Sequence, residues 1–168
     1  MFQTAKRAFS LVPVLCICAC YSFSGGGGFP QHVRTLFIAP FENKTVKFEL
    51  DTQIQRELSD KLPRALGVRQ GGEKTADAVI RGEIVAYEDR AQNYRPGQSG
   101  TVTVIQHDVT ITVNVRVIDV KNNRYIWEGN SLTGQGQYKP DTETDEAARK
   151  RAIQNVIQRI IDGAQSQW

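Results

Sequence analysis

The sequence predicts an α+β domain with the order β-α-β-β-β-α, in which a mixed four-stranded sheet carries both helices packed on one face. Three observations lead to this fold class. Residues 50–66 and 153–164 repeat apolar side chains at helical spacing. Residues 109–117 alternate strictly between apolar and polar, as a half-buried strand does. Further short apolar runs lie between the two helical stretches and before them, bounded by Gly and Pro.

The first strand is expected over residues 33–40, where apolar side chains on both faces indicate burial on both sides, and Pro40 ends it. The first helix is expected over residues 48–66. Pro63 should kink or end this helix because proline removes a backbone hydrogen bond, and Gly67 is a plausible stop. The apolar row of the helix consists of Leu50, Ile54, Leu58, Leu62 and Leu66.

The second strand is expected over residues 76–87, and the polar stretch 88–100 is interpreted as a long loop or an extended hairpin. The third strand shows the clearest pattern. Its packed face is Val109, Ile111, Val113, Val115 and Val117, and its polar face is Thr110, Thr112, Asn114 and Arg116. Residues 121–123 form a hairpin turn, and a fourth strand runs from Tyr125 to about Gly134.

The last helix is expected to begin near Thr142, a good capping residue, with acidic side chains in its first turn that suit the helix dipole. A wide apolar stripe follows, and Arg149 and neighbouring basic residues lie largely off it. The stripe fits either a helix on a membrane surface or a helix over the core. We favour the core, because the sheet needs a cover. The stripe consists of Ile153, Val156, Ile157, Ile160, Ile161 and Ala164.

Residues 1–19 have the pattern of a secretory signal peptide. Lys6 and Arg7 are basic, residues 9–17 are apolar, and small Ala19 follows. The apolar run is shorter than the roughly 20 residues that a membrane-spanning helix needs. A buried strand or short core helix is the alternative interpretation.

The cysteines indicate a lipid anchor rather than a disulfide framework or a zinc site. Cys16, Cys18 and Cys20 lie within five residues and none follows, whereas a disulfide-rich domain distributes its cysteines through the fold. Residues 17–20 resemble a bacterial lipobox, so cleavage before Cys20 and acylation of Cys20 are expected. An ordinary signal peptide cut nearby is the competing interpretation. Residues 20–32, with four consecutive glycines at 25–28, would then be a flexible tether to a single domain over residues 33–168.

Charge argues against nucleic acid as a partner. The leader holds two of the 21 basic residues, so 21 minus 2 leaves 19 against 18 acidic residues, a formal net charge of +1. Nucleic-acid-binding domains usually carry a clustered basic surface.

The sequence shows little catalytic chemistry. His107 stands beside Asp108, but adjacent strand residues point to opposite faces, and His32 is far away in sequence. We find no signature of a nucleophile, a metal site or a cofactor site, so an enzyme is disfavoured. Arg90, Arg95 and Lys139 flank two predicted loops. They are either contacts for an anionic ligand or ordinary surface charges.

The segments IAPFENKT, ADAVIRGEIVAYEDR and VTITVNVRVIDVKNNRYIWEG, followed by the closing helix, resemble in order the LptE family of lipopolysaccharide-assembly lipoproteins. The start CYSFSG is similar to that of mature family members, although the glycine usually found after the cysteine is missing. The resemblance covers nearly all of the chain after the leader.

This resemblance implies a non-enzymatic lipoprotein, anchored through Cys20 on the periplasmic face of the outer membrane. It implies a plug inside the LptD β-barrel translocon that supports barrel assembly and lipopolysaccharide delivery to the outer leaflet. Arg90 falls at a matching place for lipopolysaccharide contact, and Lys139 matches only loosely. The alternative is a lipoprotein subunit of another envelope machine, such as a barrel-assembly or secretion complex. An envelope hydrolase is disfavoured.

Overall fold

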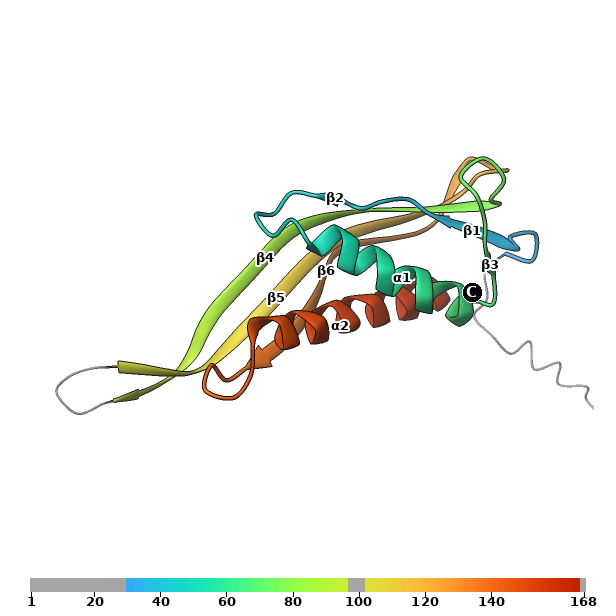
Figure 1. Ribbon diagram of the computed structural model, residues 1–168. Helices are drawn as coiled ribbons and strands as arrows, with labels where there is room; N and C mark the ends of the chain where they lie inside the picture. Colours follow the sequence, from blue (N-terminus) through green and yellow to red (C-terminus); the bar gives the residue numbers. More distant parts are fainter. Residues whose placement is uncertain (1–29, 97–101, 167–168) are drawn as a thin grey trace, which may run out of the picture.

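The computed structural model describes residues 30–96 and 102–166, and the predicted leader, Cys20 and most of the predicted tether lie outside them. The described chain folds as one sheet with two helices (Figure 1), which confirms the α+β class and the core order β-α-β-β-β-α. In chain order the elements are β1 (Thr35–Ile38), β2 (Glu42–Asn43), α1 (Leu50–Leu66), β3 (Arg69–Gln70), β4 (Ala78–Pro96), β5 (Val102–Asp119), β6 (Arg124–Tyr138) and α2 (Asp145–Gln165).

The sheet is mixed, as predicted, but it has six strands rather than four. Its order is β3-β1-β4-β5-β6, and β2 pairs with β4 off this path. β1 runs parallel to β3 and β4, whereas β4, β5 and β6 are antiparallel. The two additional strands, β2 and β3, have two residues each. A strand this short shows no alternation in sequence, which is why the pattern did not reveal them.

The stretch 88–96 is strand rather than loop, so the extended-hairpin interpretation holds. β4 continues to Pro96 and β5 already begins at Val102, with Arg95 opposite Thr103. Figure 1 shows this end of the hairpin projecting beyond the helices as an arm. Because no helix covers the arm, its sequence lacks the apolar alternation that marks the third strand further along.

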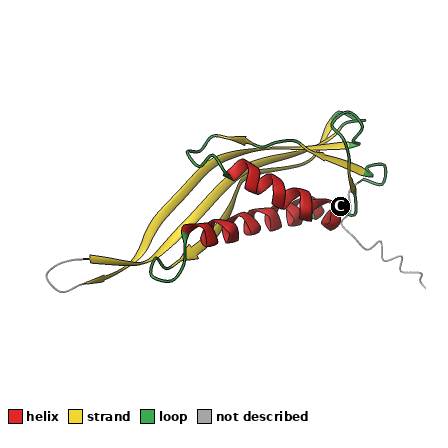
Figure 2. Ribbon diagram, in the orientation of Figure 1, coloured by secondary structure: helices red, strands yellow, loops and turns green. Residues whose placement is uncertain are grey.

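Both helices cover the same face of the sheet, as predicted (Figure 2). The alternating residues of β5 from Val109 to Val117 face them and are buried, which confirms the predicted register. α1 does not end at Pro63 but continues to Leu66, because buried Leu62 and Leu66 hold its last turn in the core and offset the missing hydrogen bond. The stop at Gly67 is confirmed by its left-handed φ of 67°.

α2 begins at Asp145, three residues later than predicted. The N–H groups of Thr142 and Glu143 both donate to the carbonyl of Lys139, so these residues form a turn and Thr144 takes the N-cap position. The apolar stripe of α2 is buried against the sheet, which confirms the core interpretation of this helix.

α2 approaches β6 closely because two glycines lie beneath it. A Cβ on Gly134 would lie 2.1 Å from the carbonyl oxygen of Ala152, and a Cβ on Gly136 would lie 2.0 Å from that of Ala148. The small alanines and side-chain-free glycines therefore let the helix backbone pack directly on the strand. This contact fixes the position of α2 along the last strand.

Candidate functional site

Two of the three predicted ligand-contact residues lie at the end of the sheet from which the β4–β5 arm projects. Arg90 is on β4 and Lys139 directly follows β6. Arg90 is opposite Asp108 of β5, which is opposite Gln137 of β6. At two strand spacings, the backbones of Arg90 and Gln137 are therefore about 10 Å apart. The antiparallel register thus brings together residues that are far apart in sequence.

The three predicted residues differ in how free their side chains are to contact a ligand. The Arg90 guanidinium lies 2.9 Å from the Glu88 carboxylate, and its side chain is 69% exposed. Lys139 is exposed and forms no ion pair with another described residue. Arg95 is placed by its backbone alone, within the arm, and its side chain is outside the described part of the molecule.

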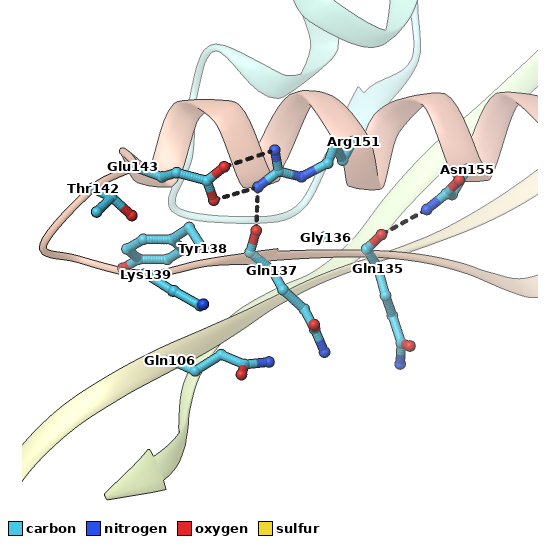
Figure 3. A pocket seen from close by; sticks show the side chains of 10 residues that line it. All are labelled: Gln106, Gln135, Gly136, Gln137, Tyr138, Lys139, Thr142, Glu143, Arg151 and Asn155. Carbon is cyan, nitrogen blue, oxygen red and sulfur yellow. Dashed lines mark hydrogen bonds and ion pairs between the residues drawn. The ribbon is translucent and has the colours of Figure 1, made fainter. Parts of the chain in front are cut away.

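Lys139 borders a polar hollow of about 720 Å³ between the end of β6 and the start of α2 (Figure 3). Its walls carry amide, hydroxyl, carboxylate and guanidinium groups, so it suits a ligand rich in hydrogen-bonding oxygens rather than an apolar one. The lining residues are Gln106, Gln135, Gly136, Gln137, Tyr138, Lys139, Thr142, Glu143, Arg151 and Asn155. Of these residues, only Lys139 was predicted from the sequence to contact a ligand.

Polar side chains of α2 form one wall of this hollow and bond the edge of β6. Arg151 donates to the carbonyl of Gln137 and lies 2.9 Å from the Glu143 carboxylate, as Figure 3 shows. Asn155 donates to the carbonyl of Gln135 over 2.7 Å. A free sheet edge invites pairing with another strand, and these bonds occupy it. The guanidinium of Arg151 is therefore already neutralised, which leaves Lys139 as the cation available to a ligand among the described lining residues.

A second cluster joins three strands near the same end. Asp89 of β4 lies 2.7 Å from Nδ1 of His107 on β5 and accepts a hydrogen bond of 3.0 Å from the Tyr138 hydroxyl. Burial, together with the hydrogen bond to Asp89, raises the pKa of Tyr138 to about 12. His107 therefore pairs across the sheet and not with adjacent Asp108, as the strand geometry predicted. The partner Asp89 was missed because it is 18 residues away, and bulges between residues 91 and 94 shift the register.

The prediction that Arg149 lies largely off the buried stripe of the last helix is wrong. Arg149 is buried between the two helices, where it lies 3.0 Å from Asp145 and donates to the side-chain oxygen of Gln53. A buried guanidinium needs such partners. Burial also raises the pKa of nearby Tyr87, against the opposing effect of Arg149. We interpret this cluster as a structural link between the helices.

His32, at the end of the predicted tether, is held in the fold at the opposite end of the sheet. Its Nε2 lies 2.7 Å from the buried Asp119 carboxylate. Burial alone would raise the pKa of Asp119, but hydrogen bonds from Asn122 and His32 lower it to about 2. Asp119 is thus ionised in the folded protein and fixes the start of the described chain to the β5–β6 turn.

Within residues 30–96 and 102–166, no group of three or more His, Cys, Asp or Glu side chains is arranged to hold a metal ion. No helix in the same part of the chain is long and apolar enough to span a membrane. Cys16, Cys18 and Cys20 lie outside these residues, so the structure does not describe the predicted lipidation site.

The comparisons with known proteins agree with the resemblance seen in the sequence. A family model for LptE, described as lipopolysaccharide-assembly, matches residues 33–163. No curated protein matches the chain.

Among solved structures, a variant of PelC from Paraburkholderia phytofirmans, a dodecamer, matches with a TM-score of 0.52 and 13% identity over 84% of this chain and 95% of its own. The hypothetical protein CT253 from Chlamydia trachomatis matches with a TM-score of 0.50 and 11% identity over 79% of this chain and 99% of its own. At these identities the likeness concerns the fold alone.

Proposed function

Because the chain belongs to the LptE lipopolysaccharide-assembly family, we propose that it is a non-enzymatic outer-membrane lipoprotein that plugs the LptD β-barrel translocon. In this role it supports assembly of the barrel and assists lipopolysaccharide delivery to the outer leaflet. The observation that carries the proposal is the family match over residues 33–163, which spans nearly the whole folded domain.

The outer face of the sheet supports a position inside a barrel. The helices cover one face, and the other presents Thr110, Thr112, Asn114 and Arg116 of β5. The lumen of an outer-membrane barrel is polar and partly hydrated. A plug must therefore offer polar surface outside its own core, and this sheet face offers it without unpaired backbone groups.

The proposed contact with lipopolysaccharide rests on the end of the sheet that carries Arg90 and Lys139. Lipopolysaccharide carries phosphates and acidic sugars on an acyl body. Lysine and arginine bind such groups through charge-assisted hydrogen bonds. Lys139 borders a hollow with polar walls, and Arg90 is largely exposed on the same end of the sheet. These positions suit contact with a headgroup rather than with acyl chains.

Co-purification from detergent extracts tests the plug. We expect the tagged protein to recover one large β-barrel protein at one-to-one stoichiometry, and we expect that barrel to assemble poorly in cells depleted of this chain. Recovery of a multi-subunit complex without such stoichiometry would support the alternative, a lipoprotein subunit of a barrel-assembly or secretion machine.

Acylation is tested separately at Cys20. We expect cells supplied with labelled fatty acid to label the parent protein, and the Cys20→Ala variant to incorporate none, because the thiol of Cys20 is the proposed acyl acceptor. Cys18→Ala is the matched control, since that residue lies in the part removed by cleavage. Continued labelling of the Cys20→Ala variant would refute the anchor.

A further inference from the structure

The end of the sheet where the described chain begins is built from three segments. They are residues 30–34 leading into β1, residues 71–77 between β3 and β4, and the β5–β6 turn at 119–124. The Asp77 carboxylate accepts hydrogen bonds from the N–H groups of Arg34 and Thr35, and the Asp77 carbonyl accepts one from the N–H of Val120 over 2.9 Å. These bonds hold the three segments side by side, opposite the projecting arm (Figure 1).

This end carries a cluster of cations, the basic end, defined as Arg34, Arg69, Lys74, Lys121 and Arg124. All five are exposed. Within the described residues, the first four form no ion pair, and Arg124 lies 3.9 Å from Asp119.

The acidic groups around the basic end do not neutralise it. Asp77 and Asp119 are each held by internal hydrogen bonds that lower their pKa, so both carboxylates are ionised. Glu73 is exposed in the same turn as Lys74, and with the ionised Asp77 and Asp119 it makes three negative charges against the five cations, which leaves a net charge of +2. The surface is therefore positive and suits an anionic partner.

Exposed apolar groups are interleaved with two of these cations. Val120 is 51% exposed and Tyr125 is 59% exposed, on either side of Lys121 and Arg124 in the β5–β6 turn. A tyrosine with one polar and one apolar end is favoured in the headgroup region of a bilayer. Cations beside such groups match a surface that offers phosphates above an apolar layer.

The position of the basic end also fits a membrane. The chain from Cys20 to Pro30 spans ten residue-to-residue steps and reaches at most about 35 Å when fully extended. A lipid on Cys20 would therefore keep this end of the domain, and not the arm, close to the bilayer surface. Tethering of this kind raises the effective concentration of a weak second contact.

We propose that the basic end docks on the phosphate groups of an anionic phospholipid bilayer and so orients the domain with the arm pointing away from that surface. The proposal rests on the proposed lipid anchor for its setting in the cell. It adds to that anchor a second contact, one that sets orientation. A single acyl-type anchor leaves orientation free, whereas a lipid combined with a basic patch fixes one face towards the membrane.

Flotation of the protein with vesicles tests this surface without the acyl chains. The chain from residue 20 onwards, carrying Cys20→Ser, is mixed with vesicles of phosphatidylcholine alone or with one-third phosphatidylglycerol. We expect binding to the anionic vesicles only, and weaker binding at high salt because exposed charges are screened. Each basic residue near an anionic surface contributes about fivefold. Lys74→Glu with Lys121→Glu removes two such residues and adds two negative charges, so it should weaken binding by more than about 30-fold.

The matched control is Arg56→Glu with Lys150→Glu, which changes the net charge equally but on the exposed helical side of the domain. We expect this control to bind like the parent, with all proteins melting at the same temperature. If the Lys74, Lys121 variant unfolds, Lys74→Gln with Lys121→Gln replaces it. Equal loss in test and control variants, or equal binding to neutral vesicles, would overturn the proposal.

Loss of barrel co-purification by the Lys74, Lys121 variant, with vesicle binding intact, would also overturn it and would assign the basic end to a protein partner. Failure of the anchor itself is distinguishable, because it appears in fatty-acid labelling of Cys20 and not in flotation of the unacylated chain.

Discussion

At the residue scale, Asp119 shows how one buried charge connects the start of the domain to a distant turn. Its carboxylate accepts hydrogen bonds from the backbone and side chain of Asn122, and His32 lies 2.7 Å away. These donors outweigh the effect of burial, so the group stays ionised in the fold. The cost of desolvating the carboxylate is offset only while the donors remain in place, which makes this site sensitive to acid.

We predict that Asp119 gives the folded protein a specific acid dependence. Its folded pKa of about 2 lies below the ordinary value of 3.8 for an aspartate, so its stabilisation is complete above about pH 4 and is lost as pH falls towards 2. The loss amounts to about 2 kcal/mol by linkage. Urea unfolding between pH 2 and pH 6 measures it. Asp119→Asn should be less stable at neutral pH and should lack this part of the acid dependence. Exposed Asp141→Asn should keep it.

The two faces of β5 give a second prediction at this scale. Val113 is fully buried, whereas adjacent Thr112 is half-buried on the polar face. Val113→Asp would bury an unpaired carboxylate and should cost several kcal/mol of unfolding free energy. Thr112→Asp should be tolerated because its side chain reaches water. Thermal melts compare the two variants, and equal melting temperatures would contradict the register.

At the scale of the element, hydrophobic periodicity predicted the strands and helices that are buried on one face. It missed the strand segments that have no such buried face. The β5 alternation and the α1 row of leucines follow directly from burial on one side. The arm beyond Glu88 has no covering helix, so nothing in its sequence required alternation. β2 and β3 are fixed by pairing with β4 and β1, a long-range contact that no local pattern records.

The contact of α2 with β6 is another feature that the sequence alone did not reveal, and it supports a prediction. Gly136→Ala would place a Cβ 2.0 Å from the carbonyl oxygen of Ala148, a backbone atom that can move only with the helix. We expect a loss of about 1–3 kcal/mol or more, as for other overpacked cores. Gly72→Ala is the control, because its Cβ would meet only the Thr75 hydroxyl, at 3.3 Å. Urea unfolding with the two variants side by side gives the difference, and equal stability would contradict the close packing.

At the scale of the whole molecule, the elongated sheet separates two ends of different chemistry. The start of the described chain and the basic end lie together, and the arm and the polar hollow lie at the other end (Figure 1). The sequence identified Arg90 and Lys139 as candidates because they are cations near expected chain reversals. It did not identify the hollow, since nine of its ten lining residues carry no motif and converge only through the pairing of β5 with β6 and the packing of α2.

The last prediction concerns the end with the arm and rests on the proposed ligand. Lipopolysaccharide phosphates should meet Arg90, Arg95 and Lys139, and charge-assisted bonds to the exposed Arg90 and Lys139 form without burying a lone charge. We expect the triple change of these residues to Ala to weaken lipopolysaccharide binding, most clearly at low salt, because exposed charges are screened within about 8 Å at physiological ionic strength. Barrel association and melting temperature should change little, because Arg90 and Lys139 are exposed.

Binding of labelled lipopolysaccharide to the purified protein, measured at low and high salt, gives the comparison. Arg56→Ala with Lys150→Ala removes exposed cations of the helical layer and serves as the control for nonspecific charge. If the triple variant binds like the parent at low salt, Arg90, Arg95 and Lys139 are solvated surface charges. The role of the chain would then be that of a structural plug without a direct contact to its cargo at these positions.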